Sequence, residues 1–320
     1  RLGVPAVSPM LPDSAGAVLL DNDAIGRMAA SHLLDQGFRN LAFFGERNAP
    51  WSAEREAGFR AQWKLMLGGR RGVTFHRLAL LQEDTPGWRP ELARVAAWLR
   101  ALPKPVGIMA CRDHRARELV QACRSLRLRI PGDVAIVGVD NDVLLCEMSD
   151  PSISSVSVPW ESIGYHMAER LHRLLQRRKP PARAPLVRPD GVVVRGSSDI
   201  YATSDPAVLR ACRHIRERST QKLSVAALAR VASVCRRDLE RRFRRQLGRS
   251  PHEEIVRVRL ATAKKLILDT SLSVAAVAER SGFPSSQRLL AAFRRFLGRT
   301  PARYRAAQRQ GRPPKRRVTG

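Results

Sequence analysis

The hydrophobic positions of the first 200 residues follow two alternating periods. Short apolar runs, typical of buried strands, alternate with longer segments whose apolar residues recur every three or four positions, as in helices that cover a sheet. The predicted strands are 18–20, 41–44, 75–80, 106–111, 134–139, 153–158 and 192–194, and the predicted helices are 24–36, 53–66, 91–102, 115–126 and 161–176. This alternation predicts an α/β doubly wound parallel sheet flanked by helices.

The last 120 residues show only the helical period, and part of the pattern is written twice. Residues 223–230 (LSVAALAR) recur as 272–279 (LSVAAVAE), and residues 243–251 (FRRQLGRSP) recur as 293–301 (FRRFLGRTP). Each copy predicts a short helix capped by Ser, a tight turn and a longer helix that ends at Gly. We therefore expect an all-α domain with two helix-turn-helix units.

The longer helix of each unit has an apolar stripe and an opposite face rich in Arg. The stripes are Leu239, Phe243 and Leu247 in the first unit and Leu289, Phe293 and Leu297 in the second. The opposite faces carry Arg237, Arg241, Arg244 and Arg245 in the first unit and Gln287, Ala291, Arg294 and Arg295 in the second. Arg pairs with guanine and Gln with adenine in the major groove. A solvated basic face would explain one such helix, but two alike favour DNA binding.

The segment between the two units predicts a rigid connector. Pro251 and the acidic pair Glu253 and Glu254 suit the start of a helix, and apolar residues continue at helical spacing to about Asp269. A helix of that length is about 28 Å long at ~1.5 Å per residue. Major grooves on one face of DNA lie about 34 Å apart, so one chain can hold its two units in adjacent grooves without dimerising.

Charge and cysteine content narrow the choice of partner and compartment. Residues 201–320 hold 29 Lys and Arg against 8 Asp and Glu, so most of the net charge of +28 lies there, which favours a polyanionic partner. No apolar run approaches 18 residues, which argues against a membrane. The five cysteines are scattered, which argues against disulfides and zinc and favours a reducing cytoplasm, as does the lack of a signal peptide. We expect no metal and no cofactor.

Residues 209–306 resemble the AraC/XylS-type transcriptional activators, through both units and the closing segment 298–305 (GRTPARYR). The resemblance implies that bases are read by Arg237, Glu240 and Arg241 in the first unit and by Ser286, Gln287, Arg288 and Ala291 in the second. We expect phosphate contacts from Arg244, Arg245, Arg294 and Arg295. Two positions depart from the family pattern: Ser233 replaces a usual Gly, and Cys235 replaces a usual Ser N-cap. Because a thiol caps poorly, the first recognition helix is predicted to fray.

Segments of the first 200 residues resemble the sugar-binding core of LacI-type regulators and periplasmic binding proteins. They are residues 23–37, 52–59, 111–113, 131–142 and 151–158. Fused to AraC-type units, this core is similar to xylose-operon regulators. The resemblance implies an effector site at the carboxyl ends of the strands, with Arg55 clamping sugar hydroxyls, Asp140 accepting from them, and Arg112 and Asp113 beside them. Position 112 is usually Asn, so Arg112 departs from the pattern. Alternatively, Asp113 and Asp140 cap the helices that follow them.

The resemblance also implies that the two-lobed domain is incomplete, because the first strands and helices of lobe one would precede Arg1. We expect strands 18–20 and 153–158 to lack their usual sheet partners, and sugar binding to be weak. A truncation, a misannotated start or a degenerate gene would each explain this. The predicted divisions are an effector domain (1–198), a linker (199–206), a DNA-binding domain (207–308) and a disordered basic tail (309–320). The tail partly resembles a minor-groove AT-hook, although a nonspecific basic tail is the simpler interpretation.

The predicted function is that of a sequence-specific DNA-binding regulator, an activator of a sugar-catabolism operon that responds to a small sugar such as xylose. The predicted partners are an operator duplex, the sugar, RNA polymerase and a second copy of the chain. One alternative is an architectural DNA-binding protein without a ligand response. Another is a sugar or nucleotide enzyme with an appended DNA-binding module. The sequence has no P-loop, GxSxG or HExxH motif and no paired catalytic carboxylates, so we expect no enzyme.

Overall fold

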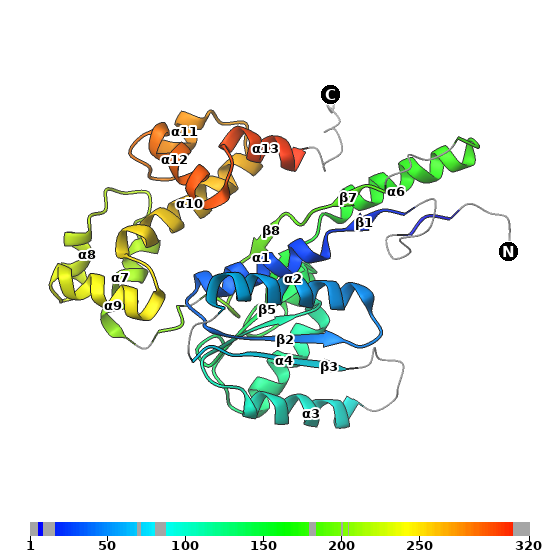
Figure 1. The fold of residues 1–320 in the computed structure, drawn as a ribbon, viewed down its shortest axis with the longest axis horizontal. Coiled ribbons are helices and arrows are strands. Elements are labelled where there is room, and N and C mark those ends of the chain that lie inside the picture. The colour runs from blue at the N-terminus through cyan, green and yellow to red at the C-terminus, as the bar shows by residue number, and fades with distance from the viewer. Residues whose placement is uncertain are drawn as a thin grey trace. The chain divides into compact units, whose positions relative to one another are not determined.

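The chain forms two compact units, residues 1–200 and 201–320 (Figure 1). The computed structural model describes residues 6–8, 17–68, 72–80, 88–178, 184–199, 201–203 and 205–309. The first unit is α/β and the second is all-α, which confirms the predicted fold class. The basic tail and its AT-hook-like segment lie outside the described residues.

The first unit is built on a six-stranded sheet in the order β3-β2-β4-β5-β6-β8. Its strands are β2 (Asn40–Glu46), β3 (Phe75–Leu80), β4 (Val106–Ala110), β5 (Val134–Asp140), β6 (Ser154–Ser157) and β8 (Gly191–Val193). All neighbours are parallel except β6 and β8, which are antiparallel. A separate parallel pair joins β1 (Leu19–Leu20) to β7 (Leu186–Val187).

Strands 18–20 and 153–158, which we expected to lack their usual partners in lobe one, both pair with strands of this chain. The backbone of β6 pairs with β5 on one side and with β8 on the other, so it is an interior strand of the sheet. β1, which corresponds to predicted strand 18–20, pairs with β7. β7 has only two residues and follows an Arg- and Pro-rich stretch, so the sequence pattern does not predict it. In both cases the partner comes from the segment after residue 185, far along the chain, which local patterning does not reveal.

Helices cover both faces of the sheet (Figure 1). They are α1 (Asn22–Asp35) and α2 (Pro50–Leu67) on one face and α3 (Trp88–Ala101) and α4 (Asp113–Ser125) on the other, followed by α5 (Val143–Glu147) and α6 (Trp160–Leu175). Neighbouring residues of a strand serve opposite faces: Phe43 contacts Phe59 of α2, with ring centroids 6.2 Å apart, whereas Phe44 belongs to the core under α3 and α4. Burial on both faces explains why these strands are continuously apolar.

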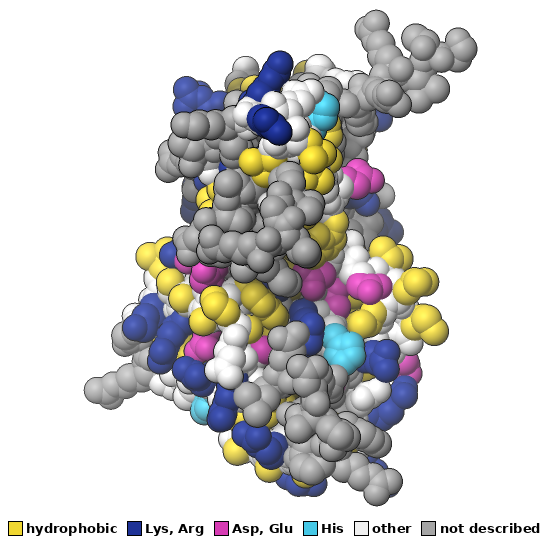
Figure 2. Space-filling view, turned by 90° about the vertical axis from the view of Figure 1, so that its right-hand side faces the viewer, with side chains coloured by type: hydrophobic (Ala, Val, Ile, Leu, Met, Phe, Trp, Pro, Cys, Tyr) yellow, Lys and Arg dark blue, Asp and Glu magenta, His cyan; other side chains and the backbone are white. Residues whose placement is uncertain are grey.

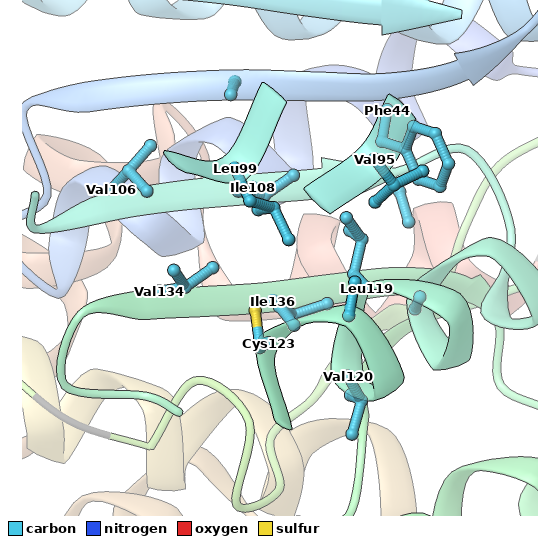
Figure 3. Packing of buried hydrophobic residues seen from close by; sticks show 14 of the residues in the cluster. Phe44, Val95, Leu99, Val106, Ile108, Leu119, Val120, Cys123, Val134 and Ile136 are labelled. Atoms are coloured by element: carbon cyan, nitrogen blue, oxygen red, sulfur yellow. The ribbon is translucent and has the colours of Figure 1, made fainter. Parts of the chain in front are cut away.

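The core between the sheet and α3 and α4 is shown in Figure 3. Val106 and Ile108 of β4 and Val134 and Ile136 of β5 belong to the same cluster as Leu119 of α4, and these side chains are all fully buried. This packing fixes the relative positions of β4, β5 and α4. The loops at the carboxyl ends of the two strands, which carry the predicted effector residues, therefore rest on a rigid base.

The second unit consists of seven helices around α10 in the described residues (Figure 1). They are α7 (Pro206–Glu217), α8 (Val225–Val231), α9 (Arg236–Leu247), α10 (Pro251–Asp269), α11 (Val274–Arg280), α12 (Ser286–Leu297) and α13 (Pro301–Arg309). The predicted connector is α10, and its first turn holds a capping box between Ser250 and Glu253. Ile255 and Val258 pack in the core of α7, α8 and α9, whereas Leu260, Ala263 and Ile267 pack in the core of α11, α12 and α13.

The two helix-turn-helix units also touch directly, at a contact that we call the junction (residues 219–221, Arg259 and Gly282). Arg259 of α10 is 7% exposed, and it donates from Nε to the carbonyl oxygen of Ser219 (2.8 Å) and from Nη2 to that of Gln221 (2.7 Å). Gly282, in the turn of the second helix-turn-helix unit, has a φ of +81°. A Cβ atom there would lie 2.4 Å from the carbonyl oxygen of Ser219. The junction connects the α7–α8 loop to the turn of the second helix-turn-helix unit.

A third buried cluster anchors the start of the second unit. Tyr201 donates from its hydroxyl to Glu254 of α10 (2.6 Å), and Arg249 and Arg257 pair with the same carboxylate. Burial alone would raise the pKa of Glu254, but the two arginines and the Tyr201 hydroxyl lower it to about 2. Tyr201, which falls in the predicted linker, is therefore part of the second unit's core.

The surface carries Lys and Arg side chains over much of the face in Figure 2, with hydrophobic side chains exposed between them. The exposed large hydrophobic residues of α5 and α6 include Val143, Leu144, Trp160 and Leu175. No helix in the described part of the chain is long and apolar enough to cross a bilayer. Within the described ranges, no three His, Cys, Asp or Glu side chains gather closely enough to hold a metal ion.

Candidate nucleic-acid interface and effector site

The recognition helices α9 and α12 are packed on one side and exposed on the other, as predicted. Leu239, Phe243, Leu289 and Phe293 are fully buried, and Leu247 is nearly so, whereas Leu297 is only partly buried. The predicted outward residues are all exposed: Arg237, Arg241, Arg244 and Arg245 on α9, and Gln287, Arg288, Ala291, Arg294 and Arg295 on α12. Glu240 and Ser286 are half-buried. Each helix therefore presents an exposed, mostly polar face opposite a buried apolar one.

Several of these side chains form ion pairs with neighbours of opposite charge. Arg241 pairs with Asp238, Glu240 pairs with Arg236 (3.0 Å), and Arg295 pairs with Glu253 (2.8 Å). Exposed pairs of this kind contribute about 0–1 kcal/mol, so phosphates or bases can replace the acidic partner at little cost. Arg237, Arg244, Arg288 and Arg294 form no ion pair with any described residue.

The two recognition helices differ at their first residues. The N-cap of α12 is Ser285, whose side chain accepts from the backbone N–H of Arg288 (3.3 Å), whereas the Cys235 side chain at the N-cap of α9 makes no capping bond. The preceding turns differ as well, because Ser233 holds a φ of +55° where the second unit has Gly282. A Cβ atom makes that conformation costly. These two departures weaken the start of α9 relative to α12.

The predicted effector residues lie at the carboxyl ends of the parallel strands. Arg55 of α2 is 5% exposed and donates from Nε to Asn22 Oδ1 (3.0 Å) and from Nη1 to the carbonyl oxygen of Cys111, and its guanidinium stacks on Trp51. Arg55 Nη2 lies 3.9 Å from Asp140 Oδ1. Burial lowers the pKa of Arg55 and raises that of Asp140, and their mutual attraction opposes both shifts. The structure therefore brings Arg55 and Asp140 together.

Asp113 is turned into the protein and ties two loops together. One carboxylate oxygen accepts from the Ser155 hydroxyl (2.6 Å) and the other from the backbone N–H of Asp142 (2.9 Å). Burial raises the pKa of Asp113 to about 6, although both hydrogen bonds oppose the shift. Gly138 makes room for this carboxylate, because a Cβ atom there would lie 2.1 Å from Asp113 Oδ1.

The alternative in which Asp113 and Asp140 cap the following helices is wrong. The N-cap of α4 is Arg112, which makes no side-chain capping bond, and the N-cap of α5 is Asp142, which accepts from the N–H of Leu145. Asp113 already lies within the first turn of α4, and its side chain is directed to β6 and the β5–α5 loop. Its carboxylate supports the turn that carries Asp140.

Sequence reasoning missed Glu46, the last residue of β2. Its side chain is fully buried, and Oε1 lies 2.7 Å from Arg112 Nε and 3.2 Å from Arg115 Nε. The contact with Arg112 is an ion pair rather than an aligned hydrogen bond. The second oxygen, Oε2, is buried without a hydrogen-bond partner among the described residues. A signal was available, since Glu46 ends β2 as Asp140 ends β5, and both strand ends lie at the same edge of the sheet.

Two families of known domains match this chain. Residues 30–198 match the periplasmic binding protein-like domain, and residues 228–307 match a helix-turn-helix domain. These two matches fall in the first and the second unit respectively.

Proteins with both parts are similar over nearly the whole chain. The xylose operon regulatory protein of Escherichia coli strain K12 is 33% identical over 294 residues, which cover 90% of this chain and 73% of that protein. The xylose operon regulatory protein of Haemophilus influenzae is 31% identical over 291 residues, which cover 90% and 74%. The solved structure of the xylose-binding transcription activator xylR superimposes with a TM-score of 0.54 and 30% identity, covering 94% of this chain and 78% of that one.

Proposed function

Because this chain belongs to the family of transcription regulators that join a periplasmic-binding-protein-like domain to an AraC-type helix-turn-helix domain, we propose that it activates a sugar-catabolism operon in response to xylose or a closely related sugar. The observation that carries the proposal is the presence, in one chain, of two exposed basic recognition helices and a sugar-type binding edge. Two similar proteins are named for the xylose operon, which makes xylose the first effector to test.

DNA is read by both units at once. On α9 the base contacts come from Arg237, Glu240 and Arg241, and on α12 they come from Ser286, Gln287, Arg288 and Ala291. The phosphate contacts come from Arg244, Arg245, Arg294 and Arg295. Support comes from the exposure of both faces and from α10, which together with the junction holds the two recognition helices in a fixed relation. One chain then recognises two half-sites one helical turn apart, and RNA polymerase and a second copy of the chain are further partners.

The sugar is bound at the edge formed by the ends of β2, β4 and β5. Asp140 accepts from sugar hydroxyls, and the almost completely buried Arg55 holds Asp140 in place. Arg112 adds further donors, and Asp113 keeps the loop of Asp140 in position. Arg and carboxylate groups can each engage two hydroxyls, which suits a polyol.

The DNA-binding part is tested by selecting duplexes from a random pool with the whole chain and measuring affinity against salt. We expect a selected site with two motifs, and log K falling by about 0.9 per phosphate contact as log[salt] rises. Binding without sequence preference would favour the architectural alternative, and a flat salt response would contradict DNA binding by the basic faces.

The division between base and phosphate contacts is tested on the same selected duplex. Gln287→Ala or Arg288→Ala should cost about 1–3 kcal/mol and relax preference at one or two base pairs. Arg244→Ala, farther along α9, should weaken all sequences alike. Equal loss of specificity from all three variants would show that the assignment is wrong.

The effector response is tested by adding D-xylose to the DNA-binding and reporter assays. A change in operator affinity or transcription with xylose, but not with a sugar that fails to bind, supports the proposal. Turnover of pentoses or nucleotides by the purified chain would instead favour the enzyme alternative.

A further inference from the structure

Arg112 raises a question about the charge of the effector. An exposed arginine at a binding edge would normally attract an acidic ligand. The Arg112 side chain is 30% exposed, so a ligand can reach it. Asp140, which is 29% exposed, lies near enough for Arg112 to lower its pKa. Of the four residues assigned to the site, Arg112 and Asp140 carry accessible charges, since Arg55 and Asp113 are almost completely buried.

The charge of Arg112 is already balanced from inside the protein. Glu46 is fully buried and stands 2.7 Å from Arg112 Nε. Arg115, the other cation beside Glu46, is fully buried and has its own carboxylate in Glu118 at 2.9 Å. A buried carboxylate is costly unless it is paired, and Glu46 still leaves one oxygen without a hydrogen-bond partner among the described residues. The charged neighbours of Glu46, rather than apolar packing, therefore hold its carboxylate at this position.

We propose that Glu46 fixes the charge class of the effector: it cancels the charge of Arg112, so that this edge binds an uncharged sugar and rejects sugar acids and sugar phosphates. Arg112, held in position by Glu46, then donates N–H hydrogen bonds to sugar hydroxyls, and Asp140 accepts from them. This inference rests on the proposed function, because it assigns the selectivity of the same site.

The magnitude follows from the charges that an anionic ligand would meet. A carboxylate bound at Arg112 would lie within reach of both Glu46 and Asp140. A like charge about 6 Å away at an effective dielectric constant of about 20 corresponds to roughly a hundredfold in affinity. Screening by water and salt reduces this, so we expect a discrimination of at least about tenfold from Glu46.

The experiment measures binding of D-xylose, D-glucuronate and D-xylonate to the whole chain by calorimetry, and compares the ratio of acid to neutral affinity between variants. The wild type should bind D-xylose more tightly than either acid, by about tenfold or more. Glu46→Gln leaves Arg112 uncompensated and should shift the ratio toward at least one acid by about tenfold. Glu118→Gln is the matched control, because it removes the same charge beside the buried Arg115, which a ligand cannot reach, and should leave the ratio unchanged.

A second variant acts in the opposite direction and does not depend on a core substitution. Arg112→Gln changes a side chain that is 30% exposed, leaves Glu46 with the buried Arg115 as its only cationic partner among the described residues, and should widen the preference for D-xylose over both acids. A ratio is insensitive to partial unfolding, which lowers the binding of all three ligands together. Rescue is expected in the double variant Glu46→Gln with Arg112→Gln, whose ratio should return toward that of the wild type.

The outcomes separate the inference from the proposed function. Tighter binding of an acid by the wild type, or an unchanged ratio in both single variants, would overturn the role of Glu46 and leave a sugar-responsive regulator intact. An equal shift in Glu118→Gln would show that net charge alone acts, which also overturns it. Failure of the wild type to bind any of the three ligands would overturn the proposed effector site and this inference with it.

Discussion

Substituting Gly282 by alanine should destabilise the all-α unit (residues 201–320) far more than the same change at Gly298. Both glycines have positive φ, +81° and +65°. A Cβ atom at Gly298 would meet nothing within 4 Å, whereas at Gly282 it would lie 2.4 Å from the Ser219 oxygen and 2.7 Å from Thr220 Cα. The two variants therefore share the backbone strain and differ only in the contact at the junction.

The expected magnitudes follow from these two contributions. A left-handed conformation costs an L-residue about 1–2 kcal/mol, which is the whole cost for Gly298→Ala. Overpacking adds about 1–3 kcal/mol, and here the obstructing atoms are backbone that cannot rotate away. Displacing Ser219 would also disturb its hydrogen bond from Arg259. Gly282→Ala should therefore lose about 2–5 kcal/mol in total.

The assay is urea denaturation of residues 201–320, monitored by circular dichroism, for the wild type and both variants. Operator affinity at native spacing, and with one base pair inserted between the half-sites, should be measured in parallel. If the junction sets the relation of the two units, Gly282→Ala loses affinity at native spacing and is less sensitive to the insertion. Unfolding free energies of the two variants within about 0.5 kcal/mol of each other would refute the proposed contact.

Three further predictions concern single side chains. Cys235→Ser should supply the missing cap of α9 and tighten the first half-site by up to about 1 kcal/mol; footprints that sharpen equally at both half-sites would contradict this. Asp113 has a folded pKa of about 6, above its ordinary 3.8, so its contribution to stability is present below about pH 4 and is lost as pH rises through 6. The shift amounts to about 3 kcal/mol, and Asp113→Asn should remove that slope from urea midpoints between pH 4 and 7; an unaltered slope would assign it to another group. Glu254 is the reverse case: its pKa of about 2 gives stability that is present above about pH 4.5 and lost as pH falls through 2. Glu254→Gln should cost about 3 kcal/mol at pH 7 because Arg249 and Arg257 lose their carboxylate, and a loss below 1 kcal/mol in denaturation would contradict the buried network.

Local patterning was sufficient for most elements of the fold, although it did not predict the short β7 and α5. The repeat placed both helix-turn-helix units, and the Pro251 and Glu253 signals located α10 at its observed bounds. The contrast between Cys235 and Ser285 as caps was also visible in the sequence, because capping depends on one side chain and the next few backbone N–H groups. The same holds for the exposed faces of α9 and α12, which follow from helical periodicity alone.

Residues whose partners are distant in the chain could not be assigned from the sequence. Arg259 looks like one more surface arginine, yet its ligands are two carbonyl oxygens about 40 residues away. The side chain of Asp113 was placed at the effector edge, whereas it serves Ser155 and Asp142. Glu46 was not singled out because a single acidic residue at a strand end has no periodicity; its strand position indicates the edge, but only the fold shows its contact with Arg112.

Residues of α10 only two positions apart pack in different cores, Val258 in the first and Leu260 in the second. By contrast, the outward residues of α9 and α12 can be exchanged singly without entering either core. Within this domain, the residues that can vary are therefore separate from those that set the spacing of the two half-sites. A descendant can acquire a new target sequence by surface substitutions on one recognition helix, while the distance between its two half-sites is passed on unchanged, since altering it would require both cores to be rebuilt together.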